Sequence, residues 1–322
     1  MSSGSPPDND RLRLGVSTCL LGEQVRFDGG HKHDRFLTDV LGRYVEWVPV
    51  CPELEVGMGV PREAVRLAGD VEAPRMVGVR TTRDHTRAMR RFAAARVRQL
   101  AGLGLHGYVC KRASPSCGME RVRVYGGRGA PSRRGRGLFT AAFVEALPLV
   151  PIEEEGRLGD PVLRETFIER VFAYRRWQAL AASPTRAALT AFHAVHEHQL
   201  LAHSPMHYRA LDRLVGERKR RRPGALVASY GAAFMAALAV PATTTKQVHV
   251  LRRLAGFCRE HLDAADRRAL ARAIDEYRRF LAPLVVPLTL LRHHVEKHGV
   301  ASLQGQTYLE PHPEELMLRN HV

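Results

Sequence analysis

Three cysteines, Cys19, Cys51 and Cys117, stand at or near the ends of apolar stretches, in loops rich in Gly, Pro and Ser. Such a pattern is typical of buried strands that run into turns. The carboxyl ends of parallel strands meet at one edge of an α/β sheet, so we expect the three thiols to converge although 32 and 66 residues separate them. Soft thiolates bind zinc, copper(I) or iron–sulfur clusters, and three protein ligands leave one position open, which indicates catalysis. A loop thiol can also be a lone nucleophile.

The other two cysteines have a different setting. Cys110 lies inside the apolar run GYVC, and Cys258 lies among apolar positions of a helical pattern, so both are predicted to be core residues. No zinc-finger or ferredoxin spacing occurs. Few cysteines, an odd number of them, and a start without an apolar signal core predict a cytoplasmic protein. No apolar run is long enough to span a membrane.

The elements that must position these thiols form an α/β pattern. Strands are predicted at 12–18, 45–50, 106–111 and 147–152, a short strand or hairpin at 64–80, and a further strand at 120–125. Helices are predicted at about 33–43, 84–102 and 138–146. The Gly- and Arg-rich stretch 126–137 is predicted to be an unpacked, mobile loop. Alternation of strands with helices indicates a doubly wound, mostly parallel sheet over 12–152.

Beyond residue 160 the pattern is helical throughout. Helices are predicted at 160–181, 185–203, 205–216, 224–239, 243–262, 264–281 and 284–298. We therefore expect an α/β domain over 12–152 and an all-α domain over 160–322. Five histidines crowd residues 193–207 without an H-E-x-x-H spacing, and we interpret them as hydrogen-bonded packing or a polar groove.

The chain carries a formal net charge of +16. Such an excess attracts polyanions, with RNA or DNA the obvious candidates, although a bias toward Arg in the genome produces the same charge. The run ERKRRRP at 217–223 is the best single candidate for phosphate contact, and a solvated helix end is its other interpretation.

Several motifs resemble known families. The stretches STCLLG (17–22), VRFDG (25–29), CPELEVGMGVPR (51–62) and CKRASPSCG (110–118) are similar, in order, to the motifs of the thiouracil desulfidase family. The stretches FHAVHEHQLLAHSPMHYRALDRLV (192–215), YRRFLAPLVVPLTLLRHH (277–294) and QTYLEPHPEELMLRN (306–320) resemble the YbgA-like domain that is often fused to it. Together the two resemblances cover nearly the whole chain.

The first resemblance implies a 4Fe-4S cluster held by Cys19, Cys51 and Cys117, with no protein ligand on the fourth iron. It also implies that a thiolated pyrimidine binds this iron through sulfur, that water attacks the ring carbon, and that hydrosulfide leaves without net redox change. The substrate class is thiouracil, as a free base or within tRNA.

Roles for the polar residues near these motifs follow. We expect Glu53 to be the acid or base and Ser114 to assist it, whereas a turn cap or a pair with Arg62 is the structural alternative for Glu53. Asp28, Lys111 and Ser116 are the candidates for substrate contact, although Asp28 and the serines are also simple turn residues.

Two other functions fit the same cysteines. One is a non-enzymatic nucleic-acid-binding protein in which they hold a structural zinc, and the other is a cluster-based sensor.

Overall fold

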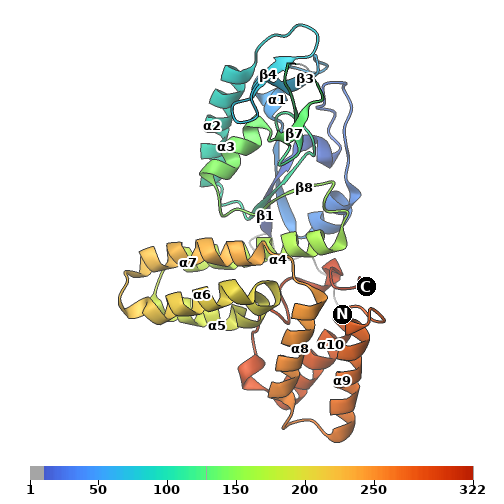
Figure 1. The fold of residues 1–322 in the computed structure, drawn as a ribbon, viewed down its shortest axis with the longest axis vertical. Coiled ribbons are helices and arrows are strands. Elements are labelled where there is room, and N and C mark those ends of the chain that lie inside the picture. Colours follow the sequence, from blue (N-terminus) through green and yellow to red (C-terminus); the bar gives the residue numbers. More distant parts are fainter. Residues whose placement is uncertain (1–10, 128, 322) are drawn as a thin grey trace. The chain divides into compact units, whose positions relative to one another are not determined.

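A computed structural model describes residues 11–127 and 129–321. The chain divides into two compact units, with the boundary between Gly159 and Asp160. The ribbon in Figure 1 shows strands only in the N-terminal unit, while the described residues after 160 form helices and turns. The prediction of a parallel-sheet α/β domain followed by an all-helical domain is confirmed.

A parallel sheet of four strands forms the centre of the N-terminal unit, in the order β2-β1-β5-β8. Its strands are β1 (Leu12–Ser17), β2 (Val45–Val50), β5 (Gly107–Cys110) and β8 (Ile152–Glu154). β1 pairs with β2 along its whole length, from Leu12 opposite Val45 to Ser17 opposite Val50. The residues of β1 are nearly all buried because this strand is central, which explains its continuous apolar character.

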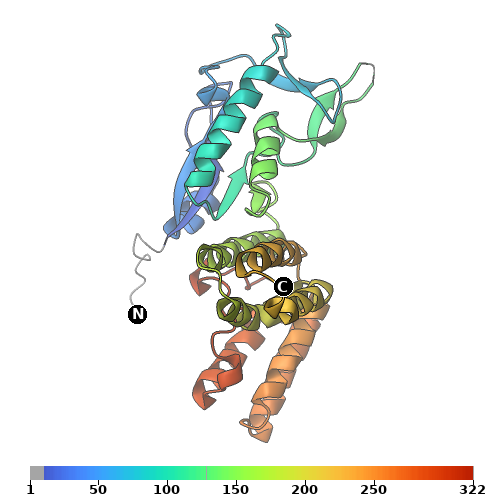
Figure 2. The ribbon, with the colours of Figure 1, turned by 90° about the vertical axis from the view of Figure 1, so that its left-hand side faces the viewer.

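Helices α2 (Thr86–Gly102) and α3 (Leu138–Ala146) pack against each other beside this sheet (Figure 2). Shorter helical segments follow the strand ends, at Thr18–Leu21, Phe36–Val40, Leu41–Arg43 and α1 (Pro52–Glu55). Tyr108 from β5 packs against Phe139 and Phe143 of α3, with ring centroids 6.0 and 4.9 Å away. Cys110 is fully buried at the end of β5, as predicted for a core residue.

A second sheet of four strands differs from the sequence-based expectation. It has the order β4-β3-β6-β7, with β3 (Val65–Ala68), β4 (Arg75–Gly78), β6 (Val122–Tyr125) and β7 (Ser132–Gly135). The stretch 126–137 was predicted to be an unpacked loop, and this is wrong for the part that forms β7. A Cβ on Gly135 would lie 2.5 Å from the side chain of Val124, so glycine allows the strands to approach.

The last strand of the parallel sheet is also shorter than predicted. Residues 147–152 were expected to form it, but β8 covers only Ile152–Glu154. Pro148 and Pro151 have no N–H group and cannot donate to a ladder. Pro151 contributes only its carbonyl, which accepts a hydrogen bond from the Tyr108 amide at 2.8 Å.

The second unit consists of helices. They are α4 (Pro161–Ala182), α5 (Arg186–His203), α6 (Pro205–Gly216), α7 (Pro223–Leu238), α8 (Thr244–Cys258), α9 (Ala264–Arg278) and α10 (Val285–His298). Side chains of the residues before five of these helices cap their first amides: Asp160, Thr185, Ser204, Thr243 and Asp263. Cys258 is buried in this core, as predicted. No helix of the described residues is both long and apolar enough to cross a membrane.

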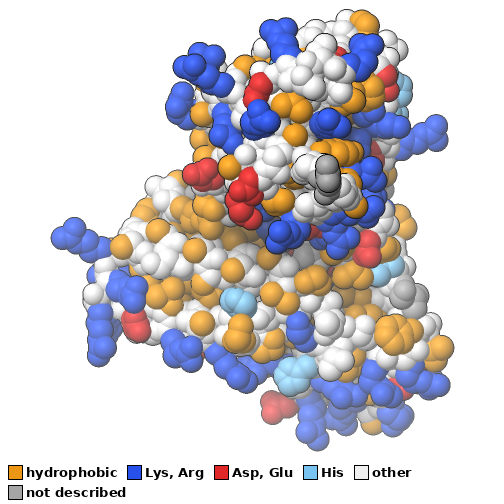
Figure 3. Space-filling view, turned by 45° about the horizontal axis from the view of Figure 1, so that its top comes forward, with side chains coloured by type: hydrophobic (Ala, Val, Ile, Leu, Met, Phe, Trp, Pro, Cys, Tyr) orange, Lys and Arg blue, Asp and Glu red, His pale blue; other side chains and the backbone are white. Residues whose placement is uncertain are grey.

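The histidines of α5 are packing residues, as interpreted from the sequence. His193, His196, His198 and His203 are buried, and the Nδ1 atom of each one forms a hydrogen bond. In the space-filling view of Figure 3, blue Lys and Arg side chains are dispersed over each unit, with hydrophobic side chains between them.

Candidate functional site

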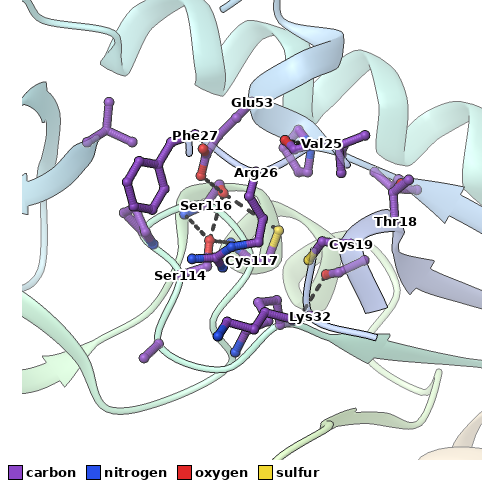
Figure 4. Close-up of a pocket in the computed structure, with 18 of the residues that line it drawn as sticks. Thr18, Cys19, Val25, Arg26, Phe27, Lys32, Glu53, Ser114, Ser116 and Cys117 are labelled. Carbon is purple, nitrogen blue, oxygen red and sulfur yellow. Dashed lines mark hydrogen bonds between the residues drawn. The ribbon is translucent and has the colours of Figure 1, made fainter. Parts of the chain in front are cut away.

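The carboxyl ends of β1, β2 and β5 open into a cavity of about 340 Å³ in the N-terminal unit. Cys19 follows β1, Cys51 follows β2, and Cys117 lies in the loop after β5. All three line this cavity, and Figure 4 labels Cys19 and Cys117. The three thiols therefore share one site. They converge because parallel strands end at the same edge of the sheet.

Local backbone features hold each cysteine in place. The turn that carries Cys19 ends at Gly22, whose φ of 94° is left-handed. Cys51 precedes α1, which starts with Pro52, and its amide donates to Glu55 Oε1 at 2.9 Å. The amide of Cys117 donates to Ser114 Oγ at 3.1 Å. Gly137 packs directly on this loop, since a Cβ there would lie 2.4 Å from the Ser116 carbonyl oxygen.

All three cysteines are free thiols in protein surroundings that favour the protonated form. Burial raises the pKa of Cys19 to about 11, the pKa of Cys117 to about 12, and that of Cys51 above its usual value. The thiols are also close enough to influence one another: Cys51 raises the pKa of Cys19, and Cys19 raises that of Cys117. Lys111 and Arg26 act in the opposite direction on Cys19. Binding of a cation would therefore displace protons from these sulfurs.

The spacing of the sulfurs distinguishes a single ion from a larger group. Three thiolates on one tetrahedral zinc, with Zn–S bonds of about 2.3 Å, would lie roughly 3.8 Å apart. The Sγ atoms of Cys19, Cys51 and Cys117 do not all lie within 4.8 Å of one another. The arrangement is therefore wider than that of three ligands on one zinc, and three cysteines around one cavity are compatible with a larger centre.

Glu53 lies beside the cysteines in the first turn of α1, and its carboxylate is held on both sides. Arg62 donates to Glu53 Oε2 from Nε at 3.0 Å and from NH2 at 2.7 Å, and the Arg62 side chain is only 6% exposed. Ser116 Oγ donates to Glu53 Oε1 at 2.7 Å. Because the one hydroxyl hydrogen of Ser116 points at Glu53, Ser114 must donate in the contact of 2.9 Å between the two serines. The order of donation is therefore Ser114 to Ser116 to Glu53.

Two of the predicted substrate contacts are placed differently from each other. Lys111 lines the cavity, and its Nζ pairs with Glu155 Oε1 at 2.5 Å and donates to the Arg112 carbonyl at 3.1 Å. Asp28 is exposed, accepts from the Gly30 amide at 3.1 Å, pairs with Arg26 at 3.4 Å, and is not among the residues that line the cavity. In this structure Asp28 therefore makes the contacts of a turn residue, which was the structural alternative for it.

The sequence reasoning missed several residues of the cavity wall. Arg26, Phe27 and Lys32 come from the loop after Cys19, and Figure 4 shows them around the sulfurs and serines. The Arg26 guanidinium lies 5.4 Å from the centre of the Phe27 ring. The Arg62 amide donates to the Phe27 carbonyl at 2.9 Å, which ties this loop to the Glu53 pair. The available signal was an aromatic residue next to Arg26 in the loop that follows the first cysteine.

Comparison with known proteins is consistent with both units. Residues 14–155 match the 2-thiouracil desulfurase family, and residues 198–313 match a family described as protein of unknown function DUF1722. The uncharacterized protein YbgA of Escherichia coli K12 is 32% identical over 153 residues, which are 47% of this chain and 90% of YbgA. A solved structure of the 4Fe-4S-dependent thiouracil desulfidase TudS is 29% identical, with a TM-score of 0.39, and the match covers 46% of this chain and 94% of that chain.

The chain thus belongs to the family of YbgA, and a 2-thiouracil desulfurase domain precedes its YbgA-like helical domain. This confirms the resemblance seen in the motifs around the cysteines and in the helical half.

Proposed function

We propose that this chain is a desulfidase that removes sulfur from a thiolated pyrimidine and releases it as hydrosulfide, with a 4Fe-4S cluster held by Cys19, Cys51 and Cys117. The observation that carries the proposal is the meeting of three thiols, two of them buried, with a Ser–Ser–Glu chain in one cavity. The match of residues 14–155 to the 2-thiouracil desulfurase family supports the same reaction.

The donor set suits such a cluster. Three soft ligands come from three loops, and cationic side chains, Arg26, Lys32 and Lys111, line the same cavity, where they would offset the charge of three thiolates. With only three protein ligands, one iron would be left to act as a Lewis acid toward the sulfur of the substrate.

Glu53 is our candidate for the base. Arg62 fixes one oxygen of this carboxylate with two hydrogen bonds and Ser116 donates to the other, so Glu53 can accept a proton through Ser116. Ser114, at the outer end of the chain of hydroxyls, is positioned to give up a proton or to orient water toward the ring carbon. Removal of a proton from that water and its return to the leaving sulfur are the steps for which the chain supplies groups.

The walls of the cavity favour a flat, polar ring. Phe27 offers an apolar face, and Arg26 and Lys111 offer donors for a ring carbonyl. A pyrimidine fits within the available volume beside a cluster, whereas the rest of a nucleotide or tRNA would have to lie outside. The net charge of +16 favours a polyanionic substrate, so thiolated tRNA is proposed beside free 2-thiouracil.

Anaerobic reconstitution with iron and sulfide tests the proposal. We expect brown protein with about four iron and four labile sulfide per chain, the stoichiometry of the cluster, and hydrosulfide release from 2-thiouracil or thiolated tRNA. Cys51→Ser should lose both the cluster and the activity. Cys110→Ala is the matched control, because Cys110 is a buried thiol of the same unit that does not line the cavity, and this variant should retain both.

Two results would overturn the proposal. Colourless protein with one zinc per chain would indicate the structural-zinc alternative, and a full cluster without hydrosulfide release from either substrate would indicate a sensor.

A further inference from the structure

The end of β8 carries three successive glutamates, Glu153, Glu154 and Glu155, to which the proposed reaction gives no role. β8 pairs with β5 in parallel, with Glu154 opposite Cys110, and the Glu155 amide donates to the Cys110 carbonyl at 3.2 Å. The loop of residues 111–120, which carries the two serines and the third cysteine of the site, begins directly after Cys110. The end of β8 therefore lies beside the start of this loop.

Glu155 holds the first end of the loop. Its Oε2 accepts from the Arg112 amide at 2.6 Å, and its Oε1 pairs with Lys111 Nζ at 2.5 Å. The side chains of Lys111 and Glu155 are only 17% and 14% exposed, so water screens this pair little. Lys111 Nζ also donates to the Arg112 carbonyl at 3.1 Å. Two of the three ammonium hydrogens are thus engaged, and one remains for a group in the cavity that Lys111 lines.

Glu154 holds the last end of the loop. Successive side chains of a strand point to opposite sides, so Glu154 reaches a different part of the loop from Glu155. Its Oε1 accepts from the Met119 amide at 2.9 Å and from the Glu120 amide at 3.4 Å. Because Glu154 is only 3% exposed, its carboxylate depends on donors from the protein. Arg157 pairs with Glu120 at 2.9 Å and adds a second contact at the same end.

The middle of the loop is held by a different element, the start of α3. The carbonyls of Pro115 and Ser116 accept from the amides of Leu138 and Phe139 at 3.1 and 3.0 Å. A loop fixed only at its middle can still shift at both ends. The bond of 2.7 Å from Ser116 Oγ to Glu53 Oε1 tolerates a shift of only a few tenths of an ångström, because hydrogen bonds weaken steeply with distance.

We propose that Glu154 and Glu155 are positioning residues of the site: Glu154 keeps the serines in line with Glu53, and Glu155 directs the Lys111 ammonium into the cavity. Neither glutamate lines the cavity, so both act through the loop. The kinetic consequences rest on the proposed function, whereas the effect on the loop does not. Loss of Glu154 should lower kcat, because it displaces the hydroxyls, and loss of Glu155 should raise KM, because it frees a donor to the ring.

Hydrogen exchange on the iron-free full chain tests the effect on the loop. In Glu154→Ala we expect the amides of Met119 and Glu120 to exchange at least about tenfold faster than in the native chain, because each loses a bond to a charged acceptor. Glu154→Gln should stay within about threefold of the native rates, because both bonds use Oε1 and the amide carbonyl of glutamine supplies the same acceptor.

Asp160→Ala is the matched control. Asp160 Oδ1 also accepts from two successive amides, those of Val162 and Leu163, at 2.9 and 3.1 Å. In this variant the first turn of α4 should exchange faster, while the amides of the 111–120 loop should keep their native rates.

Steady-state kinetics with 2-thiouracil, at equal iron and labile sulfide per chain, test the two roles. We expect kcat for hydrosulfide release to fall at least about tenfold in Glu154→Ala and to stay within about threefold in Glu154→Gln, with KM within about threefold in both. Glu155→Gln should raise KM at least about fivefold and leave kcat within about twofold.

If Glu154→Ala does not fold, which circular dichroism will show, Glu154→Asp takes its place with the same expectations, because its carboxylate falls short of the amides. Native exchange rates at Met119 and Glu120 in the folded variant, faster exchange there in Asp160→Ala, or unchanged kcat and KM in the folded variants would overturn the proposal. No hydrosulfide release from the native chain would overturn the proposed function instead, and hydrogen exchange would then decide on the anchoring of the loop alone.

Discussion

Replacement of Glu53 by Gln is the most direct test of the Ser–Ser–Glu chain. The change keeps the side-chain size and removes one charge. In the native site Arg62 donates twice to Glu53 Oε2 and Ser116 donates to Oε1. The amide oxygen of Gln must face the guanidinium, because an NH2 group there would oppose two donors. Its NH2 group then faces Ser116, whose hydroxyl must turn away.

In Glu53→Gln the hydrogen bond between residue 53 and Ser116 is reversed, so no base remains at the end of the Ser–Ser–Glu series. Ser116 could then donate only toward Cys117 Sγ, 3.6 Å away, or toward Ser114, whose Oγ already accepts from the amides of Ser116 and Cys117. Loss of a positioned general base costs about 10²- to 10⁴-fold in rate, so we expect kcat for hydrosulfide release to fall by this factor. We expect KM for 2-thiouracil to stay within about threefold, since no donor to the ring is removed. Loss of the charged pair should also lower the free energy of unfolding by about 1–3 kcal/mol.

The assay compares variants at equal iron and labile sulfide per chain, so that cluster loss is not mistaken for loss of the base. Glu46→Gln is the matched control, because Arg13 donates from Nε and NH2 to one oxygen of Glu46 in the same pattern, but on the exposed surface. It should keep full activity. A Glu53→Gln protein with normal cluster content and kcat within about threefold of the native value would refute the assignment of Glu53 as base.

Three further outcomes are expected. Asp28→Asn should change kcat/KM for 2-thiouracil by less than about twofold, because Asp28 is exposed and does not line the cavity; a loss above about tenfold in steady-state assays would return it to the site. Gly137→Ala should abolish cluster retention, measured as iron per chain, because its Cβ would overlap backbone atoms of Ser116 and Cys117. Gly126→Ala is the control and should retain iron, because there is open space around Gly126. Equal iron content in the two variants would contradict this expectation. Burial lowers the pKa of His196 to about 3 and that of His312 to about 4, with Arg176 and Arg319 respectively acting in the same direction, so below about pH 6.5 the unfolded chain takes up protons that the folded helical unit does not. Near pH 5 these two histidines should therefore lower the free energy of unfolding by about 2.7 kcal/mol per pH unit of acidification. Native-state hydrogen exchange of α5 measures this, and an opening free energy that is the same at pH 6 and pH 5 would contradict the expectation.

The shared position of the three cysteines was accessible from the sequence because it depends on local signals. Each apolar run ends in a loop of Gly, Pro and Ser, and the fold class then brings the strand ends together. The helices of the second unit were predictable for the same reason, since residues such as Asp160 and Thr185 cap them from positions next to the first turn. Strand β7 was not predictable, because its SRRG sequence has no apolar alternation and pairing with β6 stabilises it.

Of the charged partners of the site, only the pair of Glu53 with Arg62 was named from the sequence, as the structural alternative for Glu53, and the structure contains it. The sequence places Arg62 nine positions after Glu53, but it does not indicate that Ser116, 63 positions away, completes the pair. Lys111 was expected to meet substrate, and the structure pairs it with Glu155. Arg319 meets Glu165 and Glu169 across about 150 residues of chain.

What the sequence by itself determined is therefore the set of ligand-type residues and the ends of the strands and helices that carry them, because propensity, capping and periodicity act over a few residues. The tertiary structure decided which arginine and which serine hold the Glu53 carboxylate, and which predicted contact lies outside the cavity. Those outcomes depend on distances between segments far apart in the chain, and electrostatic and hydrogen-bond energies change steeply over a few ångströms.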